Sequence, residues 1–534
     1  MTRLYRRLVL TAALTMAAAL SAVSQSDTTA TNALVQMRKL NQAFRYLHSV
    51  YIDKPDMAPL VEKAVVAMLQ ELDPHSNYIP ADEMSNVSAQ LDGEFSGVGI
   101  EYRIIRDTLT VTNTIANAPA ATVGILPDDR IMAIDDKDVI GIKSGEVANL
   151  LRGKAGSKVG VTIVRRGAQE RLHFTVTRDK VPVHTIDAAY RATSKIGYIK
   201  IGRFGRTTSA EFTDALKRIK GVESLIIDLR GNGGGVMAGA IGVAEHFLSR
   251  DATIVATEGR TMPYRSVKAQ ANGDLTAMPL AVLIDENSAS ASEILAGALQ
   301  DWDRAAIIGR NSFGKGLVQR QFALEDKSAI RITVAKYRTP SGRAIQRPYR
   351  NGHRDEYYAS YRERIAHPDS VGSDTTHRRA YRTLTKGREI FDGEGIMPDI
   401  VVAADTTRMT PYIIGLVSKG IMGEYTADYL GQNAEMFGKR YGSFEQFDKE
   451  FAVTERMLSD LAARAAQGGV NIDSAHTAVS ETFVRVHLKA LVARRLFSTT
   501  EYYRITNRNN DKTFDKAVEV LSNPDLYNSL LAGE

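Results

Sequence analysis

A serine, a lysine and a run of glycines in three separate loops of this sequence are residue types suited to acyl-transfer chemistry. Ser290 lies in ENSASASEI, Lys315 follows 25 residues later in FGKG, and the glycines lie in DLRGNGGGV, residues 228–236. A serine hydroxyl is a weak nucleophile and needs an adjacent base, which a lysine can supply where burial lowers its pKa from about 10.4 toward 7–8. Successive glycines let backbone N–H groups approach an oxyanion closely. No histidine lies in these loops, so they favour a serine/lysine pair over a Ser-His-Asp triad.

Each loop also has an ordinary structural interpretation. Ser290 and Glu293 match the S-x-x-E capping box of a helix start, and on the local pattern alone this interpretation is the stronger one. A serine at a helix N-terminus nevertheless lies beside unpaired N–H donors that stabilise an oxyanion. The spacing before Lys315 resembles a nucleotide-binding P-loop, but Gly316 has no hydroxyl for Mg²⁺, which argues against that site. The glycine run does not give GxGxxG, because position 236 is valine.

The elements that must position these loops alternate between strand and helix from residue 195. The predicted strands are IGYIKIGRF, SLIIDLR, LAVLIDE and AAIIG, and the predicted helices are SAEFTDALKRI, VMAGAIGVAEHFL and ASASEILAGALQ. This alternation predicts βαβ crossovers and a largely parallel sheet. Such sheets place their sites in loops at the carboxyl ends of the strands, which is where the serine and the glycines fall. LVQRQFAL, after Lys315, is predicted as a strand.

The regions around this α/β segment have different patterns. Residues 28–72 have apolar side chains at helical spacing, and residues 90–180 contain strand-like runs with one helical stretch, SGEVANLLRG. Residues 348–385 are polar and are predicted to be an exposed insertion. From about residue 406 the chain is predicted to be helical again. We therefore expect several domains rather than one core.

The N-terminus has the pattern of a secretory signal peptide. A basic start with three arginines precedes the apolar run Leu8 to Leu20 and the small residues Ala22-Val23-Ser24. The sequence predicts export with a mature start near Gln25, and the alternative is a retained membrane anchor, for which the apolar run is short.

The composition of the chain excludes several kinds of chemistry. The chain has no cysteine, so disulfides and a catalytic thiol are excluded. Its net charge of +6 falls to +3 without the signal arginines, too low to suggest nucleic acid. The ten histidines have no metal-binding spacing, so we expect no metal and no cofactor.

Taken in order, these motifs resemble those of the C-terminal processing (tail-specific) serine peptidases. The resemblance spans roughly residues 35–405 and is carried by LDPHSNYIPADEM, FSGVGIEY, SASASEILAGALQ, FGKGLVQ, TPSGRAIQ and GIMPDIVV. It implies an α+β multidomain fold: a ClpP/crotonase-like α/β peptidase core with an inserted β-rich PDZ domain and helical N- and C-terminal regions. The corresponding domains are a signal peptide (1–24), an N-terminal helical region (25–85), a PDZ domain (86–180), the peptidase core (181–405) and a helical C-terminal domain (406–534).

The resemblance also implies roles for individual residues. Ser290 is expected to be the nucleophile, Lys315 the general base and Gln319 the residue that positions the lysine. Backbone N–H groups of Ala291 and of the glycine loop, Gly234 in first place, are expected to form the oxyanion hole. The chain departs from the family at two positions, since it has Gly233 in place of a usual proline and Leu317 in place of a common Thr or Ser. The first departure leaves open which glycine donates.

The implied PDZ domain would bind a free C-terminal carboxylate with backbone N–H groups while the peptide adds as a β-strand. Val98, Gly99 and Ile100 are the expected cradle, and Arg152 resembles a family arginine that couples the PDZ domain to the active site. An ordinary glycine turn is the alternative for SGVGIEY.

The predicted function is that of a serine endopeptidase, periplasmic or otherwise exported, acting on polypeptides with apolar C-terminal tails. An adaptor or activating protein and a homodimer formed by the N-terminal helices are the further expected partners, and latent activity awaiting a partner is compatible with this function. The alternative is a noncatalytic PDZ-containing scaffold, because the α/β core resembles that of enoyl-CoA hydratase-like proteins and a fold does not dictate a function.

Overall fold

The computed structural model describes residues 32–105, 107–115, 117–165, 167–366, 378–405, 409–509 and 511–533. The predicted signal peptide, residues 1–24, lies outside the described residues. The chain divides into two compact units, residues 1–69 and 70–534. In the first, a helix over residues 32–50 and α2 (Met57–Gln70) confirm the helical N-terminal region. Across the described ranges, no helix is both long and apolar enough to cross a membrane.

The predicted β-rich module is confirmed as an antiparallel sheet with two short helices. The strands follow the order β3-β4-β5-β7-β8 with β6 beside β5. Their bounds are β3 (Ile100–Ile105), β4 (Thr108–Thr114), β5 (Arg130–Ile134), β6 (Lys137–Asp138), β7 (Lys158–Val164) and β8 (Leu172–Thr177). The helices are α4 (Pro119–Thr122) and α5 (Ser144–Leu151), the second of which was predicted from SGEVANLLRG. Before and after this sheet, β2 (Glu94–Gly97) pairs with β9 (Asp179–Pro182).

The α/β segment forms one six-stranded sheet in the order β10-β11-β12-β15-β16-β21, in which only the β10–β11 pair is antiparallel. The bounds are β10 (Ile186–Arg191), β11 (Ile196–Ile201), β12 (Ser224–Asp228), β15 (Leu280–Ile284), β16 (Ala306–Gly309) and β21 (Ile400–Val401). The four strands β11, β12, β15 and β16 are buried along their whole length. Continuous apolar runs of this kind need helices over both faces of the sheet.

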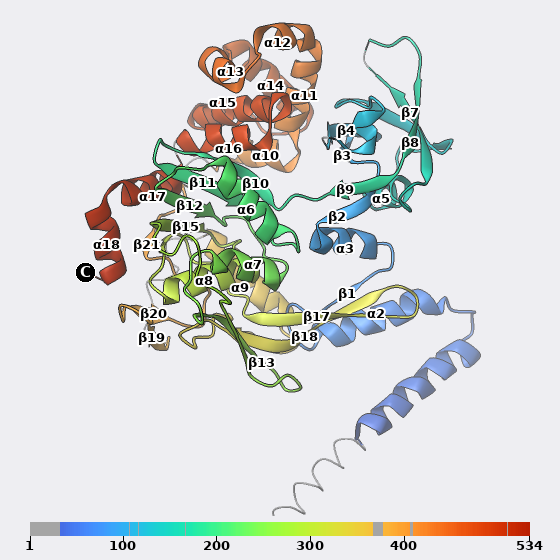
Figure 1. Cartoon of the computed structure of the whole chain (residues 1–534). Helices are drawn as coiled ribbons and strands as arrows, with labels where there is room; N and C mark the ends of the chain where they lie inside the picture. The colour runs from blue at the N-terminus through green and yellow to red at the C-terminus, as the bar shows by residue number, and fades with distance from the viewer. Residues whose placement is uncertain are drawn as a thin grey trace, which may run out of the picture. The chain divides into compact units, whose positions relative to one another are not determined.

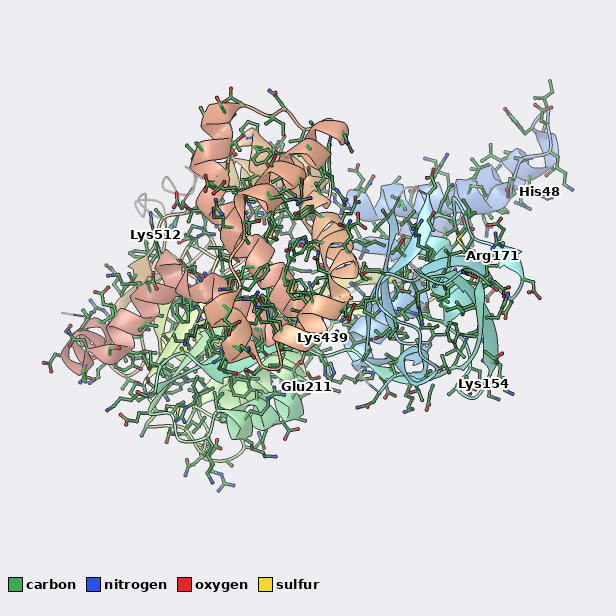
Figure 2. All side chains as sticks on the ribbon, turned by 90° about the horizontal axis from the view of Figure 1, so that it is seen from above. His48, Lys154, Arg171, Glu211, Lys439 and Lys512 are labelled. Atoms are coloured by element: carbon green, nitrogen blue, oxygen red, sulfur yellow. The ribbon has the colours of Figure 1, made fainter. Side chains whose placement is uncertain are left out.

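Two groups of helices provide that cover (Figure 1). One face packs on α6 (Thr208–Arg218), α7 (Met237–Glu245) and α8 (Ala291–Asp301), and the other on α17 (Lys512–Ser522) and α18 (Pro524–Ala532). Alternate strand residues serve the two faces: Ile199 and Ile227 belong to the first apolar cluster, and Tyr198 and Ile226 to the second. Lys512, which begins α17, is exposed (Figure 2).

A second sheet carries the strand that follows Lys315. Its elements are β1 (Asn77–Ile79), β13 (Thr253–Glu258), β14 (Arg265–Lys268), β17 (Leu317–Ala323) and β18 (Ala329–Arg338). Strand β17 confirms the prediction for LVQRQFAL. Strand β1 precedes the PDZ module in sequence yet pairs with β18, the partner of β17. The segment just before the PDZ module is therefore built into the sheet that positions Lys315.

The remaining described elements are α3 (Met84–Asp92), α9 (Arg354–Ala366), the hairpin of β19 (Ala380–Arg382) with β20 (Glu389–Phe391), and helices α10 (Pro411–Ser418), α11 (Ile421–Gln432), α12 (Ala434–Arg440), α13 (Phe444–Glu450), α14 (Glu455–Gln467), α15 (Ser474–Leu496) and α16 (Thr499–Arg508). The helices from α10 onward confirm the helical C-terminal region. They have a core of their own, with Phe437, Phe447, Leu461 and Leu488 fully or almost fully buried.

Candidate active site

Ser290 lies between β15 and α8 in a backbone conformation that residues other than glycine rarely adopt. Its φ is 56° and its ψ is −110°, which costs on the order of 1–3 kcal/mol and persists only where the surroundings hold it. Hydrogen bonds on either side of Ser290 stabilise this backbone conformation. The Ala289 N–H donates to the Asn232 carbonyl (3.0 Å), and the Tyr337 hydroxyl donates to the Ser290 carbonyl (3.1 Å). The serine is thus held at the positive N-terminal end of α8.

Glu293, in the first turn of α8, is a fully buried carboxyl group that joins Ser290 to the loop of Lys315. It accepts the Ser290 N–H at 2.7 Å, which is the bond that the capping box predicted. It also accepts the N–H groups of Gly314 (2.7 Å) and Lys315 (2.9 Å) and the Ser312 hydroxyl (2.6 Å). Burial raises the pKa of Glu293, although these hydrogen bonds act in the opposite direction. The helix cap and the candidate nucleophile are therefore parts of one arrangement rather than alternatives.

Lys315 is largely buried, and its Nζ donates to Oε1 of Gln319 at 3.0 Å. Burial is the main cause that lowers the pKa of Lys315 below its ordinary value, and the charge of Arg331 lowers it further. The charges of Glu293 and Asp73 act in the opposite direction. The neutral amine is thus formed at lower pH than in free lysine, as a general base requires.

Gln319 is held by a segment that the sequence analysis did not connect to the site. Its Nε2 donates to the carbonyl oxygen of His75 at 2.7 Å, so Oε1 is the end that faces Lys315. The His75 carbonyl is in turn held by a turn in which Asp73 accepts the N–H groups of His75 and Ser76, both at 2.9 Å. The His75 pKa is lowered to about 3 by burial and by the charge of Lys315, so its imidazole is neutral near pH 7. The D-x-x-S pattern of this turn is the sequence signal that could have located it.

The glycine loop passes directly against Ser290. Gly234 has φ +95°, and a Cβ at this position would lie 2.8 Å from the Cβ of Ser290 and 3.0 Å from the Ala291 nitrogen. Only glycine allows this approach, as expected for an oxyanion loop. The Gly234 N–H itself donates to Oδ1 of Asn232 at 2.9 Å. Gly234 can therefore donate to an oxyanion only if this bond is released or shared.

Gly233 and Leu317, the two departures from the family pattern, both fit their surroundings. A Cβ at Gly233 would meet no atom within 4 Å, so this position leaves room for a Cβ atom. Leu317 is 3% exposed at the first position of β17, where an apolar side chain is well accommodated. Neither Gly233 nor Leu317 takes part in the hydrogen bonds described above for Ser290 and Lys315.

The predicted PDZ cradle lies at the beginning of β3. Val98 is buried, and its carbonyl accepts the Ala120 N–H at 2.8 Å. Gly99 has φ +80°, and a Cβ there would lie 2.2 Å from the Cβ of Ala118, so the position excludes any side chain. Ile100 opens the strand and pairs with Thr114. A tight turn therefore precedes the strand, which fits both a carboxylate cradle and an ordinary glycine turn, and the cradle stays a prediction.

Arg152 terminates α5 and faces α3. Its Nη1 donates to the Ser85 hydroxyl at 3.2 Å, and its guanidinium lies 4.6 Å from the centre of the Phe95 ring. Burial lowers the pKa of Arg152 from its ordinary value. None of the hydrogen bonds found for Arg152 within the described ranges reaches Ser290 or Lys315, so the structure does not bring Arg152 into the candidate active site.

Helix α9 contacts the loops beside the site, although its polar segment was predicted to be exposed. Most of the helix is exposed, but Tyr357 is 3% exposed, and the Tyr361 ring lies 4.8 Å from that of Phe313. Arg364 donates to the Ser312 carbonyl at 2.9 Å. Aromatic side chains on one face of α9 thus cover the residues just ahead of Lys315, while most of the helix is exposed, as the polar segment predicts.

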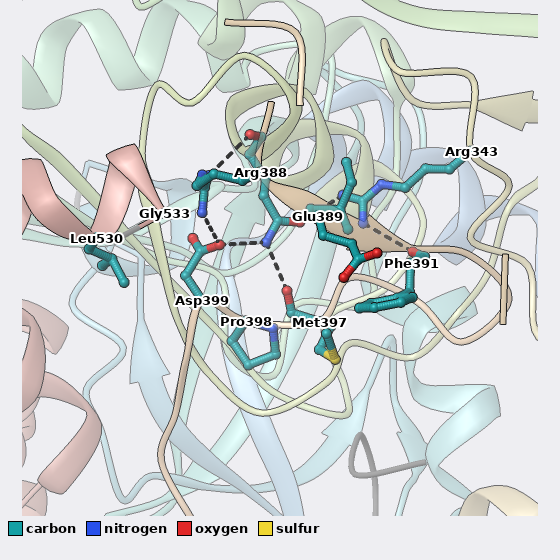
Figure 3. A pocket seen from close by; sticks show the side chains of 11 residues that line it. Arg343, Arg388, Glu389, Phe391, Met397, Pro398, Asp399, Leu530 and Gly533 are labelled. Atoms are coloured by element: carbon teal, nitrogen blue, oxygen red, sulfur yellow. Dashed lines mark hydrogen bonds and ion pairs between the residues drawn. The ribbon is translucent and has the colours of Figure 1, made fainter. Parts of the chain in front are cut away.

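A cavity of about 330 Å³ lies elsewhere, between the core and α18. Its lining includes Arg343, Arg388 and Asp399 of the core and Leu530 and Gly533 at the C-terminal end (Figure 3). Arg388 is paired with Asp399 at 2.7 Å, so its charge is already balanced. No predicted site residue lines this cavity, which is separate from the candidate active site.

Profiles of known sequence families match four segments of the chain. The profile of peptidase family S41 matches residues 195–351, and a PDZ domain profile matches residues 96–177. Residues 4–83 match an activating protease CtpB N-terminal domain, and residues 412–498 match a family of unknown function, DUF8443. The first two matches enclose the candidate active site and the predicted carboxylate cradle.

Sequence identity to individual relatives shows which family the chain belongs to. The chain is 38% identical over 340 residues to a carboxy-terminal-processing protease of Bartonella bacilliformis, covering 62% of this chain and 78% of the relative. The chain belongs to peptidase family S41. This S41 peptidase is also 33% identical over 345 residues to the carboxy-terminal processing protease CtpB of Bacillus subtilis, covering 62% and 69% of the two chains. Among solved structures, the photosystem II D1 C-terminal processing protease is 29% identical over 57% of this chain and 89% of its own, with a TM-score of 0.32. The predicted fold class and the predicted serine-type peptidase are therefore confirmed.

Proposed function

We propose that this S41 peptidase is an exported endopeptidase that binds the C-terminal tail of a polypeptide in its PDZ domain and cleaves the chain with Ser290 and Lys315. The observation that carries the proposal is the shared carboxyl group of Glu293. It binds the backbone N–H of both Ser290 and Lys315, at 2.7 and 2.9 Å. One side chain thus holds the backbone of a strained serine at a helix N-terminus and the backbone of the lysine.

In the proposed reaction Ser290 Oγ attacks the scissile carbonyl carbon, and Nζ of neutral Lys315 accepts the hydroxyl proton. The oxyanion of the tetrahedral intermediate accepts hydrogen bonds from the Ala291 N–H and from the glycine loop, aided by the dipole of α8. Lys315 then returns the proton to the leaving amine, and water hydrolyses the acyl-enzyme by the same route. Gln319 holds the amine without adding a charge that would raise its pKa.

The setting of this activity is also part of the proposal. The N-terminal signal pattern supports export to the periplasm, or attachment to the membrane if the segment is retained. Large apolar side chains on the N-terminal helices are exposed, among them Leu40 (56%), Leu47 (49%) and Phe44 (40%). Their exposure supports a homodimer or an activating partner at these helices. The rival function, a noncatalytic scaffold, has no use for a lysine whose pKa is lowered by burial, joined through Glu293 to a strained serine.

Tail recognition is tested with a disordered 40-residue peptide ending in Val-Ala-Ala and the same peptide ending in Asp-Lys-Asp, read by mass spectrometry. We expect the apolar ending to be cleaved at least about tenfold faster, since one apolar anchor contributes about 1–3 kcal/mol. Ser290→Ala is the matched inactive control for both peptides. Equal cleavage of the two peptides would contradict tail recognition, and binding without cleavage by the wild type would favour the scaffold.

The pH dependence of cleavage tests the role of Lys315. Because the base must be neutral and burial lowers the pKa of Lys315, kcat/KM should rise with pH through an apparent pKa below the ordinary 10.5 of lysine. Arg331→Met removes a charge that lowers this pKa, so the rise should move to higher pH. Arg320→Met, an exposed arginine on neighbouring β17, is the control and should leave the profile unchanged. A shift in the opposite direction would exclude Lys315 as the titrating group.

A further inference from the structure

The last two helices complete the peptidase core. Phe514 of α17 and Tyr527 of α18 belong to the apolar cluster on the second face of the central sheet, and the ring of Tyr198 lies 5.7 Å from that of Phe514. The Tyr527 hydroxyl accepts the N–H of Leu280, where β15 begins, at 3.0 Å. The strand that leads to Ser290 thus depends on α17 and α18 for its cover.

A charged link joins α17 to the start of the glycine loop. The guanidinium of Arg230 lies between two carboxylates, Asp228 (Nη2 to Oδ2, 2.6 Å) and Asp511 (Nη1 to Oδ2, 2.8 Å). The Asp228 side chain is only 1% exposed and also accepts the Tyr198 hydroxyl at 2.8 Å. Arginine does not give up its proton, so a largely buried guanidinium needs such partners. Of the two carboxylates that contact Arg230, only that of Asp511 belongs to the C-terminal region.

Asp511 has a second role as the N-cap of α17. Its Oδ1 accepts the N–H groups of Thr513 and Phe514, both at 3.1 Å. The positive end of the helix stabilises a carboxylate at this position. One side chain therefore both begins α17 and orients Arg230.

Arg230 in turn begins the backbone that reaches the candidate nucleophile. The carbonyl of Asn232 accepts the N–H of Ala289 at 3.0 Å. Two residues later Gly234 packs against Ser290, close enough to exclude a side chain. A displacement of Arg230 would be carried along these few residues to the oxyanion donors.

We propose that Asp511 is a positioning residue for the oxyanion loop, which makes α17 and α18 a functional part of the catalytic unit. The inference rests on the proposed function, since it requires Ser290 to attack and the glycine loop to stabilise the oxyanion. Asp511 touches no reacting atom and acts only through Arg230. A small shift of preorganised donors weakens transition-state binding more than substrate binding, so the effect should fall on kcat.

Asp511→Asn in the full chain separates the two roles, because asparagine caps a helix as well as aspartate does but removes the ion pair with Arg230. We expect kcat for an apolar-tailed peptide to fall about tenfold with KM within twofold. The Ki of a peptide aldehyde, which forms a tetrahedral adduct with a serine nucleophile, should rise in proportion. Asp511→Glu, which keeps the charge, should recover a substantial part of kcat.

The matched control is Asp473→Asn. Asp473 caps α15 with the same pair of bonds, to the N–H groups of Ala475 (2.8 Å) and His476 (3.1 Å), but has no link to the glycine loop. It should leave kcat unchanged. A wild-type kcat in Asp511→Asn, or an equal loss in Asp473→Asn, would overturn the inference. Failure of the wild type to cleave would instead contradict the proposed function, so the two failures are distinct.

Discussion

Lys315→Ala is expected to lower kcat for peptide-bond hydrolysis by about 10²- to 10⁴-fold, the range that a general base contributes. The alanine variant keeps Ser290 in place but leaves its hydroxyl proton without an acceptor. KM should change little, because Lys315 acts on the reacting group rather than on substrate binding. Initial rates with a fluorogenic peptide at several substrate concentrations measure both constants.

Two further variants make this prediction specific. Ser290→Ala should lower kcat to a similar extent, and the double variant should lose no more than either single one, because the two residues act as a unit. Lys336→Ala removes an exposed lysine from β18, directly paired with Leu317, and should retain wild-type kcat. Near-wild-type kcat in Lys315→Ala, or losses that add in the double variant, would contradict the proposed pair.

Glu293→Ala is expected to be the most damaging substitution for stability near the site. It would leave four donors without their acceptor, three backbone N–H groups and the Ser312 hydroxyl. Each buried donor left unpaired costs about 1–3 kcal/mol, and because the effects are not additive we expect a loss of about 3–5 kcal/mol in the free energy of unfolding. Glu293→Gln retains an acceptor oxygen, so it should lose less. Urea unfolding measures both variants.

Glu325→Ala supplies the comparison for Glu293. Glu325 is exposed in the turn between β17 and β18, so its removal should leave the urea midpoint unchanged. A wild-type midpoint for Glu293→Ala would show that the donors find other partners and that Glu293 does not join the two loops. Residual activity in folded Glu293→Gln reports separately on the alignment of Ser290 with Lys315.

The parts of the site that follow buried strands could be predicted from the sequence. Ser290 follows the apolar run of β15, and the glycine loop follows that of β12, two strands that are parallel neighbours. Their carboxyl ends therefore meet at one edge of the sheet, as such runs predict. The capping box located the first turn of α8 because it is a local signal.

The contacts that complete the site come from distant segments, which local patterns do not reveal. His75 meets Gln319 across 244 positions, and Asp511 meets Arg230 across 281. Both depend on which strands and helices pack together, and that is decided by the whole core rather than by a local run. The composition of residues 348–385 hid the docking of α9, because a few aromatic side chains such as Tyr361 hold an otherwise polar helix.

The most direct test of the serine/lysine mechanism is to trap the acyl-enzyme. The wild type, Ser290→Ala and Lys315→Ala are each mixed with a peptidyl p-nitrophenyl ester, quenched in acid and analysed by intact mass and peptide mapping. The proposed mechanism predicts a mass increase of one acyl group on Ser290 in the wild type, none in Ser290→Ala and a much slower increase in Lys315→Ala. An adduct on another residue, or undiminished turnover in Ser290→Ala, would contradict it.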